Sequence, residues 1–213
     1  TNSALECTAF NINTGATGIT PNITPVTITN GVASTGVNAS DTITIRYGTG
    51  PMGGVPTQTT TILSASATPI AVPVINNLGC QAGDISVITI GTACTMSSVG
   101  AVAGTTTVTL ADTPAASAGA NLACMGSWNE ITYAVNNGNL ERNGVPSVAG
   151  VVNLQAQYGV SAAGLANSDP NFNQITQWVN ASGGTWAAPA VVDRNRIKAI
   201  RIAVVARNAK LEM

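Results

Sequence analysis

Short runs of β-branched and apolar residues, broken every few positions by Gly, Pro or Asn, follow one another along most of this chain. This pattern is typical of strands, because β-branched side chains fit a pleated sheet and Gly, Pro and Asn favour the turns between strands. Signals for helices are nearly absent. We therefore predict a mainly β fold.

Composition changes near residue 128. Of 28 threonines, 26 lie at or before Thr132, whereas 12 of the 17 charged residues lie after Trp128. We predict two parts, a Thr/Gly-rich β lobe with hairpins over residues 1–127 and an antiparallel sheet over residues 128–213. In the first part, strands are expected over residues 26–30, 41–47, 58–63, 70–75, 84–90 and 105–110. The last two flank a long connection rich in Ser, Gly and Ala, which suggests an extended hairpin.

The second part holds the clearest hairpin of the sequence. Residues 128–135 alternate as a strand, and residues 140–142 return as the second arm. Between them lies Asn-Asn-Gly-Asn, a strong turn signal because Asn and Gly tolerate positive φ. Further strands are expected over residues 148–158, 175–179 and 196–207. In the last of these, alternation places one set of residues on a common face: Lys198, Ile200, Ile202 and Val204.

The absence of histidine limits the chemistry that this chain can perform. It excludes Ser-His and Cys-His nucleophile pairs, histidine-based zinc sites and the usual general base near neutral pH. Charged residues make up 8% of the chain, against about 25% in an average protein, and the acids are scattered. We therefore expect no enzyme activity, no catalytic residue, no metal site and no cofactor.

Two further features of the sequence are candidate ligand sites. Residues 167–173 place oxygen-bearing side chains at alternate positions, as a calcium loop does. However, only Asp169 is charged and Pro170 stiffens the segment, so an ordinary polar loop is the better interpretation. The tryptophans are scattered; we expect Trp128 and Trp178 to be core anchors rather than parts of a ligand surface.

The four cysteines, Cys7, Cys80, Cys94 and Cys124, are disulfide candidates. None are spaced as CxxC, so neither thioredoxin-like chemistry nor a zinc knuckle is supported. An even count in a charge-poor chain favours a secreted or periplasmic protein with two disulfides, the alternative being four buried free thiols in a cytosolic protein. Three pairings are open, and bonds from Cys94 to Cys124 or to Cys80 are preferred.

Six of the eight positive charges lie within 17 residues near the C-terminal end. This stripe is a candidate site for phosphates, DNA included, or for an acidic partner. The favoured alternative is a strand whose polar positions are solvated or paired with Glu130, Glu141 and Asp193. No aromatic residue interleaves with the stripe, as single-strand binders require for base stacking. Its members are Arg194, Arg196, Lys198, Arg201, Arg207 and Lys210.

Six segments of the chain together carry a family resemblance. They are residues 41–48 (DTITIRYG), 83–88 (GDISVI), 128–142, 151–160 (VVNLQAQYGV), 176–179 (TQWV) and 196–207 (RIKAIRIAVVAR). In order and spacing these segments resemble the PilW-type minor pilins, which belong to the type IV pilus assembly system of Gram-negative bacteria.

The resemblance implies a fold and a location. The fold is a pilin-like antiparallel β-sheet head with an inserted β-rich lobe, which normally packs on a hydrophobic N-terminal helix. In such pilins that helix anchors the subunit in the inner membrane before assembly. It is absent from this sequence, which starts abruptly at Thr1, so we expect a periplasmic or pilus-surface head without its anchor.

The resemblance also implies partners rather than substrates. These are other minor pilins and the major pilin, in a priming or tip complex that supports adhesion, twitching motility or DNA uptake. DNA itself is a further candidate through the basic stripe. From composition and the scattered tryptophans, the alternative function is a secreted or surface β-rich adhesin or carbohydrate-binding module outside the pilus system.

Overall fold

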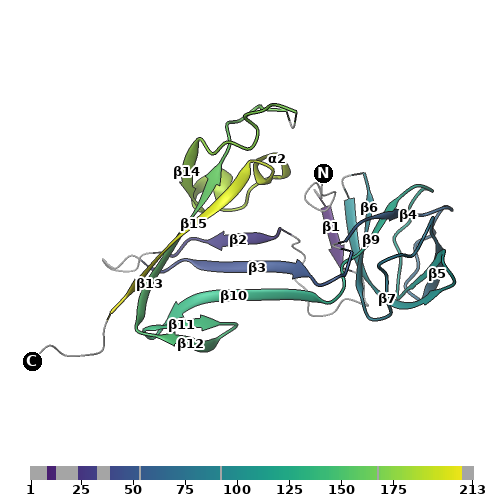
Figure 1. The fold of residues 1–213 in the computed structure, drawn as a ribbon, viewed down its shortest axis with the longest axis horizontal. Coiled ribbons are helices and arrows are strands. Elements are labelled where there is room, and N and C mark those ends of the chain that lie inside the picture. The colour runs from purple at the N-terminus through teal and green to yellow at the C-terminus, as the bar shows by residue number, and fades with distance from the viewer. Residues whose placement is uncertain are drawn as a thin grey trace, which may run out of the picture. The chain divides into compact units, whose positions relative to one another are not determined.

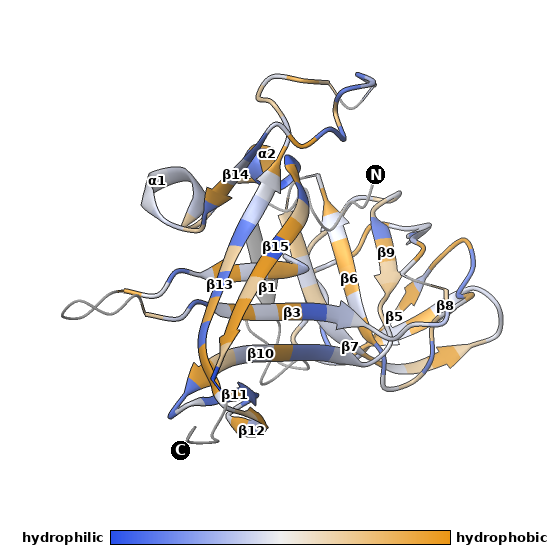
Figure 2. Cartoon of the chain, turned by 60° about the vertical axis from the view of Figure 1, so that its left-hand side comes forward, coloured by the Kyte–Doolittle hydropathy of each residue, from blue (hydrophilic) through white to orange (hydrophobic). Residues whose placement is uncertain are grey.

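The computed structural model describes residues 9–12, 24–32, 39–52, 54–91, 93–166 and 168–207. The described chain forms strands throughout, with only two helices of four residues each, so the mainly β prediction is confirmed. No helix in these ranges is long and apolar enough to cross a membrane. Figure 1 labels most of these elements, and Figure 2 adds the labels of β8 and α1.

The chain divides into two compact units. One comprises Thr1–Ile23 with Arg46–Glu130, and the other Thr24–Ile45 with Ile131–Met213. The chain therefore passes from the first unit to the second close to the composition change near residue 128. The sequence gives no comparable signal at residues 24–45, which belong to the second unit although they precede most of the first.

The first unit is built on a sheet with the strand order β4-β9-β6-β7-β8-β5, and β1 pairs with β7. The β1–β7 pair is parallel, and the other pairs of this sheet are antiparallel. The strands are β1 (Ala9–Ile12), β4 (Thr57–Gln58), β5 (Ile70–Pro73), β6 (Ile85–Ile90), β7 (Ala93–Ala103), β8 (Thr107–Leu110) and β9 (Asn121–Cys124).

Strand β7 replaces the connection that the sequence suggested between β6 and β8. It is 11 residues long and pairs with β6 on one side and β8 on the other, so the extended β6–β8 hairpin is wrong. One buried hydroxyl on β6 and one on β7 are hydrogen-bonded within this unit. The Ser86 hydroxyl donates to the Ser97 carbonyl at 3.0 Å, and the Ser97 hydroxyl donates to the Asp112 carboxylate.

The core of the first unit gathers around β6, which is largely apolar (Figure 2). The fully buried apolar side chains beside it come from β5, β7, β8 and β9, and no charged residue is among them. They are Val72, Val99, Val108, Leu110 and Leu122, together with Ile88 of β6 itself. A second small cluster in this unit is formed by Val87, Cys94 and Met96, with Trp128 packed against it.

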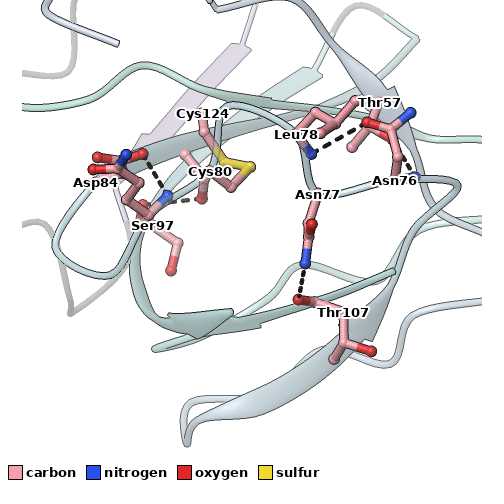
Figure 3. Close-up of a disulfide and its surroundings, with 11 residues drawn as sticks. Thr57, Asn76, Asn77, Leu78, Cys80, Asp84, Ser97, Thr107 and Cys124 are labelled. Atoms are coloured by element: carbon pink, nitrogen blue, oxygen red, sulfur yellow. Dashed lines mark hydrogen bonds between the residues drawn. A yellow bond between two sulfur atoms is a disulfide. The ribbon is translucent and has the colours of Figure 1, made fainter. Parts of the chain in front are cut away.

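A disulfide joins Cys80 to Cys124, 44 residues apart in sequence and 5.2 Å apart between Cα atoms (Figure 3). The turn that carries Cys80 is fixed by its neighbours, since the Asn77 side chain donates to the Thr107 carbonyl at 3.1 Å. The preferred bond from Cys94 to Cys80 or Cys124 is therefore wrong. Cys94 is itself disulfide-bonded, and Cys7 lies outside the described residues.

Two sheets contribute to the second unit. One has the order β12-β11-β10-β3-β2 and the other the order β14-β13-β15. Their strands are β2 (Val26–Thr29), β3 (Thr42–Gly48), β10 (Trp128–Asn136), β11 (Asn139–Arg142), β12 (Val145–Ala149), β13 (Val151–Val160), β14 (Gln177–Asn180) and β15 (Ile197–Ala206). The helices are α1 (Gly183–Trp186) and α2 (Val191–Arg194).

The predicted hairpin at residues 128–142 is confirmed as β10–β11. Asn136 pairs with Asn139, and the turn places Asn137 at φ 50° and Gly138 at φ 74°, as a two-residue turn with positive φ requires. The strand expected over residues 148–158 is instead two strands. Gly150, at φ 82°, turns the chain between β12 and β13.

The core of the second unit lies on one side of β13. Leu154, Ala156, Tyr158 and Val160 alternate along that strand and are buried, together with Ile28 and Ile43 of β2 and β3. The Tyr158 hydroxyl accepts a hydrogen bond from the Ile28 amide at 2.7 Å. A buried polar group is therefore satisfied within the apolar cluster.

Strand β15 follows the predicted alternation only in part. Its pairing with β13 shifts register between Gly159 and Val160, so that Gly159 faces Ala199 and Val160 faces Ile197. Lys198 is the extra residue of this bulge. Ile197 and Ile200 consequently both pack against the core, whereas strict alternation would place them on opposite faces.

Candidate interaction surface on strand β15

The basic stripe lies on α2 and β15 in the second unit. Arg194 ends α2, Arg196 follows it, Lys198 and Arg201 lie on β15, and Arg207 follows its last residue. Lys210 lies outside the described residues. All the described members therefore belong to one continuous segment of the fold, but they differ in how their charges are used.

Arg196 is engaged within the fold. Its guanidinium forms an ion pair with Asp193 at 2.8 Å and donates to the Ser161 carbonyl at 3.1 Å. It also lies over the Trp186 ring, 5.2 Å from the centroid. These contacts hold α2 and the start of β15 to the end of β13, which gives Arg196 a structural role without any external partner.

Arg194 and Lys198 are also partly buried. Arg194 donates to the Thr24 hydroxyl at 3.4 Å, and burial lowers the pKa of its guanidinium. Lys198 donates to the Asn195 carbonyl at 2.6 Å and lies 3.5 Å from the centroid of the Phe172 ring. Burial lowers the pKa of the Lys198 ammonium as well.

Arg201 is exposed and uses its charge differently. Its guanidinium donates to the side-chain oxygen of Gln157 and lies 4.7 Å from the centroid of the Trp178 ring. Of the acids considered as partners of the stripe, Glu130 pairs with Arg46 and Glu141 accepts from Asn136. In the described ranges, no ion pair connects Arg201 to a carboxylate.

Three aromatic rings thus lie beside three cations, which the linear sequence did not suggest. Phe172, Trp178 and Trp186 come from the segment after β13, and the fold brings them to β15. The prediction of a core position is confirmed for Trp128, which packs against a buried cluster. It is wrong for Trp178, which is 38% exposed.

The far half of β15 exposes apolar side chains. Ile202, Val204 and Val205 are 53%, 51% and 54% exposed, and β15 is at the edge of its sheet. Ile202 pairs with Ala156 and Val204 with Leu154, so both lie on the side of the sheet that carries the core. The apolar face of this sheet therefore extends beyond the part that described residues cover.

The same region of the chain matches a known protein family. Residues 115–212, which include β10 to β15, match the family model described as Type IV Pilus-assembly protein W. These residues form a PilW-family domain. The resemblance seen in the sequence is thereby confirmed, and it assigns the domain to type IV pilus assembly. No curated protein and no solved structure matches the chain.

The family of this domain implies a pilus or periplasmic location and suggests other pilus components as partners. The Cys80–Cys124 disulfide fits an extracytoplasmic location, because disulfides persist in oxidising compartments. The description of the matched family names pilus assembly, which is a structural role.

The polar loop after β13 in the PilW-family domain does not gather acidic ligands. Asp169 accepts a hydrogen bond from the Asn171 amide at 2.8 Å, which is an ordinary turn contact. Within the described ranges, no three His, Cys, Asp or Glu side chains lie close enough together to hold a metal ion.

Proposed function

We propose that this chain is the head of a minor pilin that acts by protein–protein contacts in the priming or tip complex of a type IV pilus. Its partners are other minor pilins and the major pilin, and no catalytic step is involved. The observation that carries the proposal is the exposed apolar edge of β15 within the PilW-family domain.

Two properties of β15 support a contact surface. An edge strand offers unpaired backbone donors and acceptors, which natural proteins normally protect with charges, proline or a cover. The half from Ile202 to Ala206 carries neither a charge nor a proline, since it contains only Ile, Ala and Val, and among the described strands only β13 pairs with it. Contiguous exposed apolar side chains on a soluble head are a mark of interaction sites.

The orientation of Ile202 and Val204 suggests how the surface is completed. Both side chains lie on the core side of the sheet, opposite Ala156 and Leu154, which are themselves buried. An apolar helix or a neighbouring subunit placed there would extend the existing core. In the pilin arrangement that the resemblance implies, an N-terminal helix anchors the head in the inner membrane and then in the fibre.

The proposal is tested with the full-length protein expressed in its own bacterium. Val204→Glu places a charge on the exposed apolar edge, and we expect it to abolish co-purification with the other minor pilins and the major pilin. Val192→Glu is the matched control, because Val192 is 69% exposed on α2, outside β15. Circular dichroism checks that both variants fold.

The result that contradicts the proposal is equally definite. If the unmodified protein associates with no minor pilin and with no major pilin, the assembly function is wrong. If Val204→Glu and Val192→Glu associate as strongly as the unmodified protein, the contact surface is elsewhere.

A further inference from the structure

The sheet β14-β13-β15 has a second face, directed away from its core, and this face carries polar and aromatic side chains. Paired residues on neighbouring strands share a face. One row consists of Asn180, Gln157 and Arg201, and the next of Trp178, Gly159 and Ala199. Tyr158, between the two rows on β13, points to the buried side.

Trp178 is held in place on this face rather than moving freely. Its indole lies against Gly159, where an added Cβ would be 2.8 Å from the ring atom Cζ3 and 3.2 Å from Cδ1 of Ile175. The Arg201 guanidinium lies 4.7 Å from the ring centroid. The ring is thus fixed by its neighbours while 38% of the residue stays exposed.

The polar groups beside the ring are connected to one another. The Gln157 amide donates to the Asn180 side-chain oxygen at 2.7 Å and accepts from Arg201. Two planar amides are therefore held near a partly exposed aromatic ring, and a guanidinium lies over that ring. Within the described part of the chain, the Asn180 side-chain nitrogen donates no hydrogen bond, so it remains available to a ligand.

We propose that this surface, formed by Trp178, Asn180, Gln157 and Arg201, binds a sugar ring of a glycan. The apolar C–H face of a pyranose packs on the indole. Its hydroxyls act as both donors and acceptors, which matches amides that offer both functions and a guanidinium that donates. We refer to these four residues as the Trp178 platform.

Charge favours a glycan over a nucleic acid. A nucleic-acid site requires several cations aimed at phosphates and aromatic rings for successive bases. Here Arg196 is paired with Asp193 and Lys198 is partly buried against Phe172. Arg201 is the exposed cation of the platform, and the whole chain has a net charge of −1.

This inference is independent of the pilus-assembly proposal. The Trp178 platform is on the opposite side of the sheet from Ile202 and Val204, since odd- and even-numbered residues of β15 beyond the bulge face opposite ways. A Trp178 variant is therefore expected to co-purify with pilus partners as the unmodified protein does. If one of the two proposals is wrong, the other is not affected.

The test screens the whole chain on an array of neutral and uronic-acid oligosaccharides, with oligothymidylate as the nucleic-acid probe. The tightest array oligosaccharide is then titrated calorimetrically. We expect Trp178→Ala to weaken that binding about tenfold or more, the equivalent of one aromatic stacking contact. Asn180→Ala, an exposed change that keeps the indole, should weaken it about threefold to tenfold, as the loss of one hydrogen bond does.

Arg207→Gln is the matched control, because it removes an exposed cation at the other end of β15 and should leave binding unchanged. Three results would overturn the inference. They are no oligosaccharide bound on the array, oligothymidylate bound in place of every sugar, or equal sugar affinity of the unmodified protein, Trp178→Ala and Asn180→Ala.

Discussion

Asp41 shows how one buried charge fixes a junction in the second unit. The residue is 2% exposed, and its carboxylate accepts from the Gly31 amide at 2.9 Å and the Ala156 amide at 2.7 Å. We predict that Asp41→Ala lowers the free energy of unfolding by about 2–4 kcal/mol, because one buried and one part-buried amide lose a carboxylate acceptor. Urea unfolding measures this. Asp169→Ala, in a surface turn, should change the free energy of unfolding by less than about 0.5 kcal/mol. Equal losses for the two variants would contradict the proposed role of the Asp41 carboxylate.

Tyr158 links burial to alkaline stability. Burial raises the pKa of its phenol above 10.0, while the hydrogen bond from Ile28 acts in the opposite direction. The unfolded chain therefore loses this proton before the folded chain does, so the stability present below about pH 10 declines as pH rises toward the folded pKa.

Two phenylalanine variants isolate this effect. Tyr158→Phe should flatten the decline of unfolding free energy between about pH 9 and pH 11, after a loss of about 1–3 kcal/mol at neutral pH from the unsatisfied Ile28 amide. Tyr47→Phe, at a residue 43% exposed, should keep the slope of the unmodified protein. Urea titrations at each pH supply the comparison; parallel curves for all three proteins would contradict it.

Single residues were the hardest features to predict from sequence. Nothing in the spacing of Cys80 and Cys124 distinguishes their bond from the other pairings, because the connection depends on β9 lying beside β6. The exposure of Trp178 depends likewise on Gly159, which is on another strand. In both cases the deciding neighbour is distant in sequence.

Among the turns, Gly126 depends most on the absence of a side chain. Its φ is +73°, and an added Cβ would lie 2.3 Å from the Gly50 backbone nitrogen. Gly104, at the tip of the β7–β8 hairpin, shares the positive φ of +54° but has no atom within 4 Å. Comparing substitutions at these two glycines therefore distinguishes the cost of backbone strain from the cost of steric overlap.

We predict that Gly104→Ala lowers the free energy of unfolding by about 1–2 kcal/mol, the cost of a left-handed L-residue. Gly126→Ala should lower it by about 3 kcal/mol or more, because overlap with a backbone atom is added to the same strain. Thermal and urea unfolding give both values. If Gly126→Ala loses no more unfolding free energy than Gly104→Ala, the chain segments that carry Gly50 and Gly126 can move apart without cost.

Strands that a local sequence pattern specifies were predicted, and strands that depend on pairing with neighbouring strands were missed. The β10–β11 hairpin follows from its Asn-Gly turn, and β15 from its long β-branched run. Strand β7 was missed because its small residues carry little strand signal and are stabilised by β6 and β8. The bulge at Lys198 was missed for the same reason, since only the partner strand reveals the register.

At the scale of the whole molecule, the sequence indicated the fold class and the family but only one of the three places where the chain passes between units. Composition changes near residue 128, where β10 enters the second unit. Residues 24–45 have the same Thr-rich composition as the first unit, yet Ile28 and Ile43 pack with β13. Which core a residue joins depends on its packing partners, and composition carries no information about these partners.

The charge of the whole molecule leads to the last prediction. With 8% charged residues and a net charge of −1, the chain has no field strong enough to steer or hold a polyanion. If its partners are pilus subunits bound through the apolar edge of β15, the affinity of the full-length protein for them should be nearly independent of salt, because apolar burial is not screened. Surface plasmon resonance across a salt series measures this affinity, with Arg201→Gln and Arg207→Gln expected to follow the same flat line. A steep loss of affinity with salt, reduced in those variants, would instead assign binding to the basic stripe and favour an acidic partner.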